Sequence, residues 1–409
     1  MPRFQNRLQI STFKLNALLD ITLAINDNVS IDELVRRFEK LLTDDLSIGK
    51  VMVIKLGEKW ECLLNSGFET NFFDELDIAA DLLKYDEIMH VTSEPELFPE
   101  PIDLVIPVTH KDEPIAYVLI GDIEEEGEGM SPILKHQRFI QTLSNVIIVA
   151  VENKRLFRES LRQEALKREM ELASKMQSML IPRKEQLPDN EHIRMHAFYH
   201  PHYEVGGDYY DVIKLNEKEI GFCIADVSGK GISAAILMSN FQANLQALFS
   251  EDISLELLLT RLNHRVMRSA KGEKFITLFI GKYNFGAREL KYVNAGHNPP
   301  ILYKTVSKEI IQLTNGSVGM GMLDELPFVE VQTVQMDERS KLLCFTDGLV
   351  EVLNDSGIEF GTEKLEVEMR NDDPIDANIA SIIKKQGILE GSASIFDDIS
   401  ILSAEFPGS

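Results

Sequence analysis

Four short acidic segments contain the residues of this sequence that are best suited to chemistry. They are VGGDYYD (205–211), CIADVSGKGIS (223–233), KLLCFTDGLVE (341–351) and IFDDISIL (395–402). In each segment an aspartate stands where an apolar, strand-like run meets a turn, and three of the four segments also contain glycine. The aspartates concerned are Asp208, Asp226, Asp347 and the pair Asp397 and Asp398.

Carboxylates at strand ends can present oxygen ligands to a hard cation, because a neighbouring glycine lets the backbone turn sharply and lets a ligand come close. Three of the four positions have no Lys or Arg nearby in sequence, so gathering these acids would be strongly repulsive without a metal ion. Mg²⁺ or Mn²⁺ fits ligation by oxygen alone, and the His and Cys spacing of a zinc site is absent. A single Asp-Gly sequence is equally typical of a surface turn, so the four segments alone leave both interpretations open.

Other motifs in the same region give weaker signals. The segment SGKGIS (228–233) has Gly231 where a phosphate-binding P-loop needs Ser or Thr, and it lacks the upstream glycine. The segment GGDYY has a tyrosine where the GGDEF signature of diguanylate cyclases has an acid. Ser228 and Ser233 have no His or Asp partner at a recognisable spacing, so a serine nucleophile is unsupported. His297, in NAGHNPP (294–300), is expected to hold its turn by hydrogen bonds.

Length and composition limit the kinds of protein that these residues belong to. The chain has 409 residues, enough for two or three domains, and 44% of them are apolar, which excludes a wholly disordered chain. The formal charge of −24 makes nucleic acid and anionic membranes poor partners. Cys62, Cys223 and Cys344 lie far apart in apolar runs, so we expect reduced core thiols. The start MPRFQNRLQI lacks the apolar region of a secretory signal, and no uninterrupted apolar run approaches about 20 residues, so we expect a soluble cytoplasmic protein.

The first 150 residues read as helices followed by strands. Two helices are expected within 11–45, where Ser30 and Glu33 match a capping box. The expected strands are Val51–Leu56, Trp60–Leu64, Ile102–Thr109 and Ile115–Gly121.

A helical pattern runs without Gly or Pro from near Ile133 to Ile181, and Pro182 ends it. This pattern is too long for an ordinary globular helix. Apolar residues recur in alternating three- and four-residue steps and then resume with a shift of four, which is typical of a coiled coil with a stutter. The first series is Leu143, Ile147, Ala150, Phe157 and Leu161, and the second is Ala165, Leu172 and Met179. We expect a dimerising signalling helix, with a single amphipathic helix lying on its own domain as the alternative.

The part of the chain after residue 190 is predicted to alternate strands and glycine turns with two helices. The expected strands are 193–200, 209–214, 219–226, 274–284, 289–294, 341–346 and 398–403, and the expected helices are 233–249 and 254–270.

Taken in order, VGGDYYD, ADVSGKGISAA, NAGHNPP, FTDGLVE and FDDISIL resemble the SpoIIE/RsbU-type branch of the PPM family of metal-dependent protein phosphatases. The preceding ELASKMQSMLIP (171–182) is similar to the helix that leads into that domain, so the resemblance covers about residues 171–405. It implies a mixed α/β (α+β) fold, an α-β-β-α sandwich with two antiparallel sheets and a dimetal centre at one end. The N-terminal part resembles a GAF sensor domain more loosely. The expected domains are 1–150, a signalling helix over 151–185 and the phosphatase domain over 186–409.

The resemblance also implies which residues hold two divalent ions, Mn²⁺ or Mg²⁺. Asp226 would bridge the ions, and the Val227 carbonyl and Asp208 would complete the protein ligands of one of them. Asp347 and Asp397 would hold the other ion; Asp397 is chosen over its neighbour Asp398 because it aligns with the metal-binding Asp of the family. The attacking group would be a water activated by the ions, and no further catalytic residue is assigned. No arginine stands just before Asp208 to bind phosphate, and Arg194 is the nearest candidate.

The function expected from this resemblance is a protein serine/threonine phosphatase that is regulated by its N-terminal domain. Its substrate would be a phosphorylated anti-sigma-factor antagonist, and it would form a homodimer through the linker helix. The main alternative is a non-catalytic scaffold that binds a partner and retains the fold. A nucleotide cyclase is a third possibility without a supporting loop.

Overall fold

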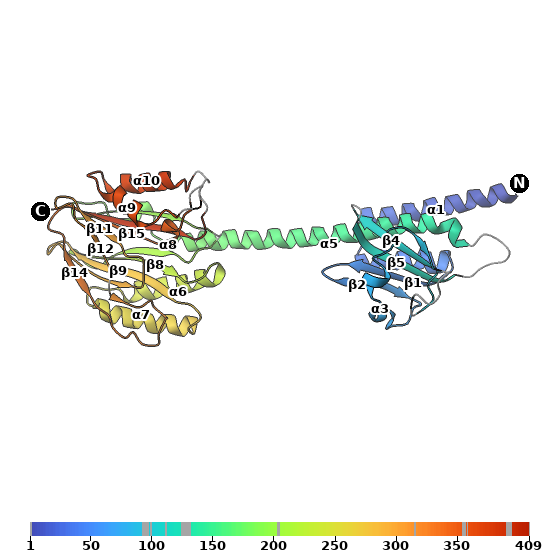
Figure 1. Ribbon diagram of the computed structural model, residues 1–409, viewed down its shortest axis with the longest axis horizontal. Coiled ribbons are helices and arrows are strands. Elements are labelled where there is room, and N and C mark those ends of the chain that lie inside the picture. Colours follow the sequence, from blue (N-terminus) through green and yellow to red (C-terminus); the bar gives the residue numbers. More distant parts are fainter. Residues whose placement is uncertain are drawn as a thin grey trace. The chain divides into compact units, whose positions relative to one another are not determined.

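The computed structural model describes residues 2–91, 98, 100–110, 113–123, 132–202, 205–314, 316–353, 357, 359–389 and 395–408. The chain divides into two compact units, residues 1–164 and 165–409. One helix, α5 (Pro132–Ser178), runs through the division (Figure 1). The division falls inside the helix because the residues on its two sides pack in different cores, and each unit is described by itself below.

Unit 1 is built on an antiparallel sheet of five strands in the order β2-β1-β5-β4-β3. The strands are β1 (Ile48–Leu56), β2 (Trp60–Ser66), β3 (Met89–His90), β4 (Leu104–His110) and β5 (Glu113–Ile123), and the helices before α5 are α1 (Pro2–Asn26), α2 (Ile31–Lys40) with a π-helical turn (Leu41–Asp45), α3 (Phe72–Glu75) and α4 (Ile78–Asp81). Ser30 caps α2 by accepting a hydrogen bond from the Glu33 N–H, as the capping-box pattern predicts. One face of the sheet packs against α1, α2 and the start of α5, and the other packs against Phe68, Phe72 and Leu82.

Helix α1 buries only part of its apolar surface in unit 1. Ala17 and Ile21 pack into the core, whereas four leucines are at least half exposed: Leu8, Leu15, Leu19 and Leu23. In the described part of the chain, Leu8–Asn26 is the single segment that is long and apolar enough by composition to cross a membrane, and 11% of it is buried. Lys14 and Asp20 interrupt this segment. Its mean hydropathy is high enough for a membrane span, although it contains no uninterrupted apolar run of that length.

Helix α5 is buried at its start and exposed to solvent in its middle. Leu143, Ile147 and Ala150 are buried against the sheet of unit 1, so this part of the predicted coiled-coil seam is used by the chain's own domain. That part of the coiled-coil prediction is wrong, and the alternative of a helix lying on its own domain holds there. From residue 156 to 169 every side chain is exposed, including Phe157 and Leu161. An isolated helix of this length is only marginally stable in water, and the apolar side chains of this stretch gain no stability from burial within their own chain.

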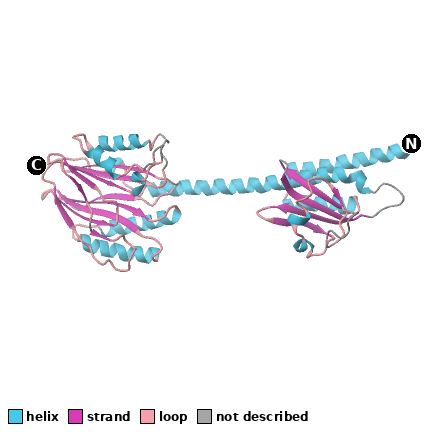
Figure 2. Cartoon of the chain, in the orientation of Figure 1, coloured by secondary structure: helices cyan, strands magenta, loops and turns pink. Residues whose placement is uncertain are grey.

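Unit 2 is a four-layered sandwich of two sheets and two pairs of helices (Figure 2). One sheet has the order β13-β10-β9-β8-β7, with β14 also paired to β10, and the other has the order β12-β11-β15-β16-β6. All described pairings are antiparallel except that of β10 with β13. The strands of the first sheet are β7 (Tyr209–Lys214), β8 (Glu219–Val227), β9 (Ile276–Asn284), β10 (Glu289–Ala295), β13 (Gly316–Ser317) and β14 (Gln332–Gln335). Those of the second are β6 (Arg194–His200), β11 (Ile301–Lys304), β12 (Ile310–Gln312), β15 (Ser340–Phe345) and β16 (Ile399–Phe406).

Helices cover the outer face of each sheet. Helices α6 (Ile232–Leu248) and α7 (Leu255–Ala270) lie on the first sheet, and α9 (Thr362–Met369) and α10 (Ile375–Gln386) lie on the second (Figure 1). A 3₁₀ turn (Lys184–Gln186) follows α5, and a short helix, α8 (Asp347–Val350), follows β15. The predicted sandwich of two antiparallel sheets between helices is therefore confirmed.

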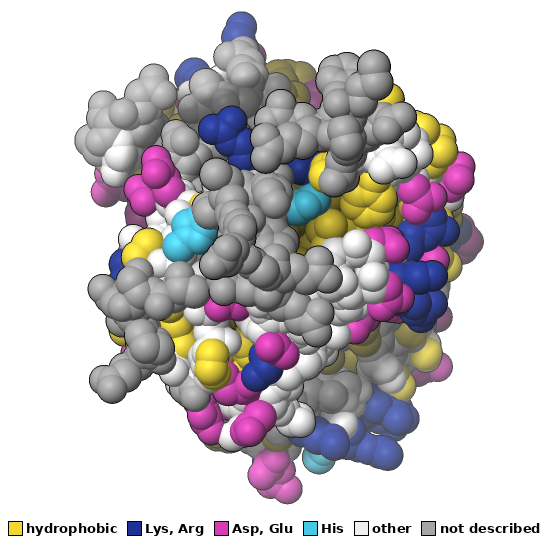
Figure 3. Space-filling model, turned by 90° about the vertical axis from the view of Figure 1, so that its right-hand side faces the viewer, with side chains coloured by type: hydrophobic (Ala, Val, Ile, Leu, Met, Phe, Trp, Pro, Cys, Tyr) yellow, Lys and Arg dark blue, Asp and Glu magenta, His cyan; other side chains and the backbone are white. Residues whose placement is uncertain are grey.

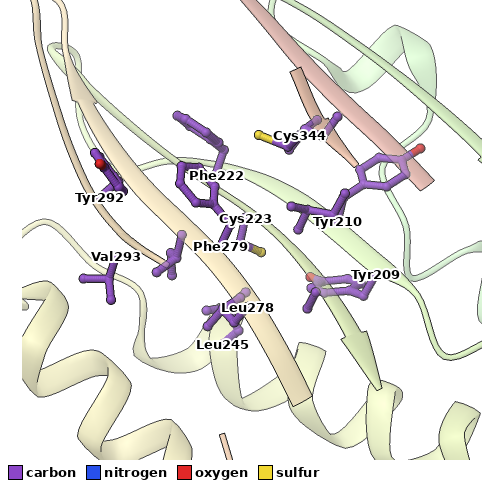
Figure 4. Packing of buried hydrophobic residues seen from close by; sticks show 14 of the residues in the cluster. Tyr209, Tyr210, Phe222, Cys223, Leu245, Leu278, Phe279, Tyr292, Val293 and Cys344 are labelled. Atoms are coloured by element: carbon purple, nitrogen blue, oxygen red, sulfur yellow. The ribbon is translucent and has the colours of Figure 1, made fainter. Parts of the chain in front are cut away.

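Successive residues of β7 enter different layers of this sandwich. Tyr209 points toward the helices and meets Phe241 of α6 edge to face, whereas Tyr210 points toward the other sheet, near Cys344 (Figure 4). This alternation is the two-residue period of a strand that is buried on both faces. The edge strand β7 is therefore packed on both of its faces, and Asp208 directly precedes it while Asp226 lies near the end of its partner β8.

Most strands and helices of unit 2 lie within two residues of their sequence predictions, for example 209–214 for β7 and 233–249 for α6. The elements β11 to β14 and α8 to α10 were not predicted: β11 to β14 and α8 contain too few residues to show a period, whereas α9 and α10 are long enough and were missed. Cys223 and Cys344 are buried as expected, but Cys62 is exposed on β2, so its assignment as a core thiol is wrong. The pairing of β2 with β1 shifts register between Leu64 and Cys62, so the two side chains do not share a face, and Cys62 lies on a strand at the sheet edge.

Candidate metal centre

The hairpin of β7 and β8 brings Asp208 next to Asp226. Tyr209 pairs with Ala225 in the antiparallel register, so the next pair toward the open end of the hairpin is Asp208 and Asp226. Asp208 is 2% exposed, whereas Asp226 is partly exposed. Two aspartates that lie 18 residues apart in sequence (226 − 208) thus share one site because of strand pairing alone.

The glycines before Asp208 are required by close approach. A Cβ atom at Gly207 would lie 2.9 Å from the Val227 carbonyl oxygen, and one at Gly206 would lie 2.3 Å from an Asp398 carboxylate oxygen. Both distances are shorter than side-chain carbon atoms tolerate. The Val227 carbonyl is therefore held at the edge of the site by a backbone that has no side chain in its way.

The other sheet contributes Asp347 and Thr346 at the end of β15. Asp347 is the first residue of α8, and Thr346 is completely buried. The Thr346 hydroxyl donates to Asp208 Oδ2 at 2.8 Å and accepts from the Ser400 backbone N–H at 2.9 Å. A Cβ at Gly348 would lie 2.1 Å from the Asp398 carbonyl oxygen, so this residue too must be glycine. Thr346 thus connects the Asp208 carboxylate beside one sheet to strand β16 of the other.

The neighbouring aspartates Asp397 and Asp398 have different surroundings. The buried Asp398 carboxylate accepts hydrogen bonds from the backbone N–H groups of His202 and Gly207, at 2.8 and 2.7 Å. The Asp397 carboxylate is one-third exposed and forms an ion pair with Lys230, whose Nζ lies 2.8 Å from Oδ2. Asp398 therefore holds the loops of the site in place, while Asp397 offers its oxygens to the open side. This difference supports the choice of Asp397 as the ligand, which stays a prediction.

Burial and, after it, the charges of neighbouring acids raise the pKa values of three of these aspartates. Burial, together with the charges of Asp226 and Asp398, raises the pKa of Asp208 well above its usual value. Burial, together with Asp347 and Asp397, raises the pKa of Asp226 to about 7. The pKa of Asp347 is also raised, first by burial and then by the charge of Asp397. Each acid is therefore within electrostatic reach of others that come from a different hairpin.

The donor set fits a hard divalent cation. It consists of four carboxylates and one backbone carbonyl, which are the oxygen ligands that Mg²⁺ and Mn²⁺ prefer. A divalent charge would relieve the repulsion that raises the pKa values of these acids. Among the described residues, no three His, Cys, Asp or Glu side chains already form a closed metal-binding cluster. The structure therefore brings the predicted ligands into one region without showing their coordination geometry.

Two further residues of this region were not predicted from the sequence, and one predicted candidate lies elsewhere. Thr346 and Lys230 contact site aspartates, although neither stands out in a sequence that contains many Thr and Lys residues. Arg194 pairs with Glu405 in the sheet, whereas the acids lie near the other end of these strands, where Ile399 pairs with His200. It forms an ion pair with Asp189 and cannot bind phosphate at the site, so that suggestion is wrong.

Gln177 connects the end of α5 to the segment that carries Asp208. Its side chain is buried, donates to the Gly206 carbonyl at 2.6 Å and accepts from the Gly206 N–H at 3.1 Å. A primary amide that makes both bonds to one peptide group fixes the position of that group. The end of the long helix is thus two residues from Asp208 through a pair of buried hydrogen bonds.

His297 has the structural role that the sequence predicts. Its backbone N–H donates to Asn294 Oδ1 at 2.8 Å, and its Nδ1 lies 2.9 Å from the Thr277 hydroxyl. Burial lowers the pKa of His297 to about 4, so the ring is neutral at ordinary pH. It holds the turn after β10 and also contacts β9 at Thr277, the residue paired with Asp226.

Comparison with known proteins identifies the C-terminal part of the chain. Residues 216–407 match the family model described as Stage II sporulation protein E (SpoIIE). This part, just under half of the chain, is similar to the SpoIIE family and is named the SpoIIE domain after that similarity. This domain includes Asp226, Asp347 and Asp397, while Asp208 lies just before the matched residues.

Two curated relatives and one solved structure resemble the SpoIIE domain. The chain is 28% identical over 195 residues to phosphoserine phosphatase RsbU of Bacillus subtilis (strain 168), which is 48% of this chain and 57% of that protein. It is 27% identical over 192 residues to phosphoserine phosphatase RsbP of the same organism, covering 45% of this chain and 46% of that protein. The chain thus spans about half the length of these relatives. In fold it is similar to the SiaA-PP2C domain of Pseudomonas aeruginosa, with a TM-score of 0.50 and 20% identity over 61% of this chain and 99% of that one.

The raised pKa of Asp226 predicts how the stability of the metal-free protein depends on pH. Because the pKa rises from 3.8 to about 7 on folding, the folded state retains this proton more strongly than the unfolded state. The corresponding contribution to stability is fully present below about pH 4 and is lost as the pH rises through about 7, a change on the order of a few kcal/mol. Urea unfolding in the presence of a chelator, from pH 4 to 8, measures it.

The variant Asp226→Asn should flatten this decline, and saturating Mn²⁺ should do the same in the unchanged protein. Asp252→Asn, at an exposed loop position before α7, is the matched control and should leave the slope as it is. An equal slope in Asp226→Asn and the unchanged protein would contradict the electrostatic description of the site.

Proposed function

We propose that the SpoIIE domain is a metal-dependent phosphatase that hydrolyses phosphoserine or phosphothreonine on a partner protein. The observation that carries this proposal is the convergence of Asp208, Asp226, Asp347 and Asp397 from two sheets at one end of the sandwich. Carboxylates that repel one another to this degree are suited to holding cations rather than to stabilising the fold. The names of the relatives, phosphoserine phosphatases, agree with this chemistry.

Two divalent ions, Mn²⁺ or Mg²⁺, are the proposed cofactors. Asp208, Asp226 and the Val227 carbonyl would hold one, and Asp226, Asp347 and Asp397 would hold the other. When bound, such ions lower the pKa of water and offset the charge of the phosphate, so that water can attack phosphorus in line. The chain itself fixes the ligands: Thr346 orients the Asp208 carboxylate, and the hydrogen bonds of Asp398 hold the adjoining loops. Positioning of this kind is most of what phosphoryl transfer requires from a protein.

The proposed substrate is a phosphorylated protein of the anti-sigma-factor antagonist class, as the family resemblance implies. The acidic composition disfavours nucleic acid as a partner. Figure 3 shows that on the face it presents, Lys and Arg side chains occur in separate groups among acidic ones. The competing proposal is a scaffold that binds the same kind of partner without catalysis, and activity measurements separate the two.

Removal of a site carboxylate should abolish phosphatase activity. Asp226→Asn and Asp347→Asn should each lower kcat for a phosphoserine peptide with Mn²⁺ by about 10³-fold or more, because each removes a charge that the ions need. Chelation of the metal should have the same effect on the unchanged protein.

The control for these variants is Asp252→Asn, which should keep full activity. If Asp226→Asn and Asp347→Asn both hydrolysed the peptide at the unchanged rate, the metal centre would be excluded. If the unchanged protein bound Mn²⁺ but hydrolysed no phosphoserine, the scaffold would be favoured.

We further propose that unit 1 is a GAF-like sensor domain of a cytoplasmic protein, and that its state reaches the metal centre through α5. The five-stranded antiparallel sheet between helices supports a GAF-like fold. Gln177 supports the relay, since a rotation or shift of α5 would move Gly206 and with it Asp208. The continuous helix between the two units contains no Gly or Pro that would break it.

Inserting residues near Glu164 tests this relay. Three extra residues rotate the helix phase by about 300°, whereas seven restore it to within about 20°. The three-residue insertion should change basal phosphatase activity or the Mn²⁺ concentration for half-maximal activity several-fold, and the seven-residue insertion is the matched control that should change both much less. Equal activities of the two insertions and the unchanged protein would argue against a rigid relay.

We also propose that two copies of the chain pair through the exposed part of α5. Phe157, Leu161 and Leu172 are each at least half exposed at the predicted seam positions, so their apolar side chains are not buried within their own chain. Pairing with a second copy would bury these side chains and stabilise the helix.

Replacement of the seam should break this pairing. Phe157→Glu combined with Leu161→Glu should convert a dimer to a monomer in sedimentation equilibrium, because like charges would face each other across the seam. Arg158→Glu with Arg162→Glu, at neighbouring exposed positions off the seam, is the control that should remain dimeric. A monomeric unchanged protein at micromolar concentration would contradict the proposal.

A further inference from the structure

Lys230 is the lysine that the described structure places in contact with a predicted metal ligand. Its Nζ lies 2.8 Å from Asp397 Oδ2, and it also donates to the Phe396 carbonyl. Its side chain is 41% exposed. The described ion pairs of the four predicted ligands involve this lysine and no arginine.

The backbone conformation of the loop that carries Lys230 depends on two glycines. It connects β8, which ends at Val227, to α6, which begins at Ile232. Gly229 and Gly231 on either side have φ angles of 81° and 76°, in the left-handed region that favours glycine. The lysine therefore stands between two glycine turns, directly after the strand that carries Asp226.

The charge of Lys230 acts on more than its direct partner. It lowers the pKa values of Asp347 and Glu351, although burial and neighbouring acids raise both of them overall. Lys230 thus lies within electrostatic reach of an acid on the opposite sheet. An ammonium group in this position lies beside two of the carboxylates that are predicted to hold the cations, Asp397 and Asp347.

We propose that Lys230 is the phosphate-binding residue of this site: its ammonium group competes with a divalent cation for Asp397 and binds a phosphoryl oxygen of the substrate. This inference rests on the proposed phosphatase function and adds to it the group that recognises the substrate's charge. Sequence analysis found no arginine for this task, and the structure excludes Arg194.

Three properties of Lys230 suit this role. Lysine binds phosphate as a point charge with three rotatable donors, so it can exchange one oxygen partner for another. Its partial exposure lets a phosphoprotein reach the ammonium group without opening the core. A divalent cation on Asp397 satisfies the carboxylate that otherwise holds Lys230, which favours a new anionic partner for the lysine.

A purely structural role makes the opposite prediction for metal binding. If Lys230 only fastened the loop to Phe396 and Asp397, its removal would loosen Asp397 and weaken Mn²⁺ binding. If it competes with the cation, removal strengthens Mn²⁺ binding. The sign of the change in metal affinity therefore distinguishes the two roles without any measurement of catalysis.

The test compares Lys230→Met with Lys230→Arg and with a control, Lys274→Met. Lys274 supports the same loop by donating to the Ser228 carbonyl at 2.8 Å, so its replacement changes the charge equally without removing a contact to the acids. Calorimetric titration of the full chain with Mn²⁺ gives the metal affinity. Titration of the Mn²⁺-loaded protein with inorganic phosphate gives the anion affinity.

Lys230→Met should bind Mn²⁺ up to about fivefold more tightly, as expected for loss of one partly exposed ion pair. It should bind inorganic phosphate about 10- to 100-fold more weakly, the range for one charge-assisted hydrogen bond. With a phosphoserine peptide its KM should rise more than its kcat falls. Lys230→Arg should restore most of the phosphate affinity, and Lys274→Met should match the unchanged protein in both titrations.

Weaker Mn²⁺ binding by Lys230→Met, or unchanged phosphate affinity, would overturn the inference, and so would the same changes in Lys274→Met. The two titrations also separate this inference from the proposed function. A protein that hydrolysed no phosphopeptide would refute the phosphatase, while the titrations would still decide whether Lys230 competes for Asp397 and binds phosphate.

Discussion

The partial burial of several carboxylates and the repulsion among them are the constraint on which the rest of unit 2 depends. Asp208 and Asp226 are brought together by one hairpin, and Asp347 and Asp397 come from the strands of the other sheet. Left to themselves, these charges would separate. They are held by the Thr346 hydroxyl and by the sandwich core behind them, in which Tyr209 and Tyr210 lock β7 between helix and sheet. A divalent cation would relieve the repulsion among these carboxylates, so the arrangement favours cation binding. Bound cations would in turn favour binding of a phosphate.

The adjacent residues Asp397 and Asp398 have different roles under the same constraint. Asp398 accepts hydrogen bonds from backbone N–H groups and stabilises the loops, whereas Asp397 forms an ion pair with the partly exposed ammonium group of Lys230. Close backbone approach at Gly207 and Gly348 brings the segments together without side chains between them. The close packing fixes the backbone of the site, whereas the ion pair of Asp397 with Lys230 is partly exposed. Such an arrangement would suit reversible binding of metal and substrate.

The long helix adds a way to adjust this site from a distance. Its first part is buried in the core of unit 1, its middle is bare, and its end holds Gly206 through Gln177. A bare amphipathic stretch between two anchored ends is suited to pairing with a second copy, and a change in that pairing would alter the position of Gln177. Control of a phosphatase would then require only a small displacement of one peptide group.

The sequence alone determined the longer strands of unit 2, the order of its motifs and the aspartates of interest, because strand periodicity and glycine-bounded turns are local properties. Within the long helix it predicted a continuous seam, but only tertiary structure decided that Leu143 and Ile147 pack on the chain's own sheet while Phe157 and Leu161 remain exposed. It likewise could not reveal the roles of Thr346, Lys230 or Gln177, or the exposure of Cys62. These depend on contacts between segments up to about 170 residues apart, such as Lys230 with Phe396 at a separation of 166. The two sheets bring these segments together, and no local sequence pattern encodes that contact. This is the physical reason that the residues around the aspartates could be found only in the folded chain.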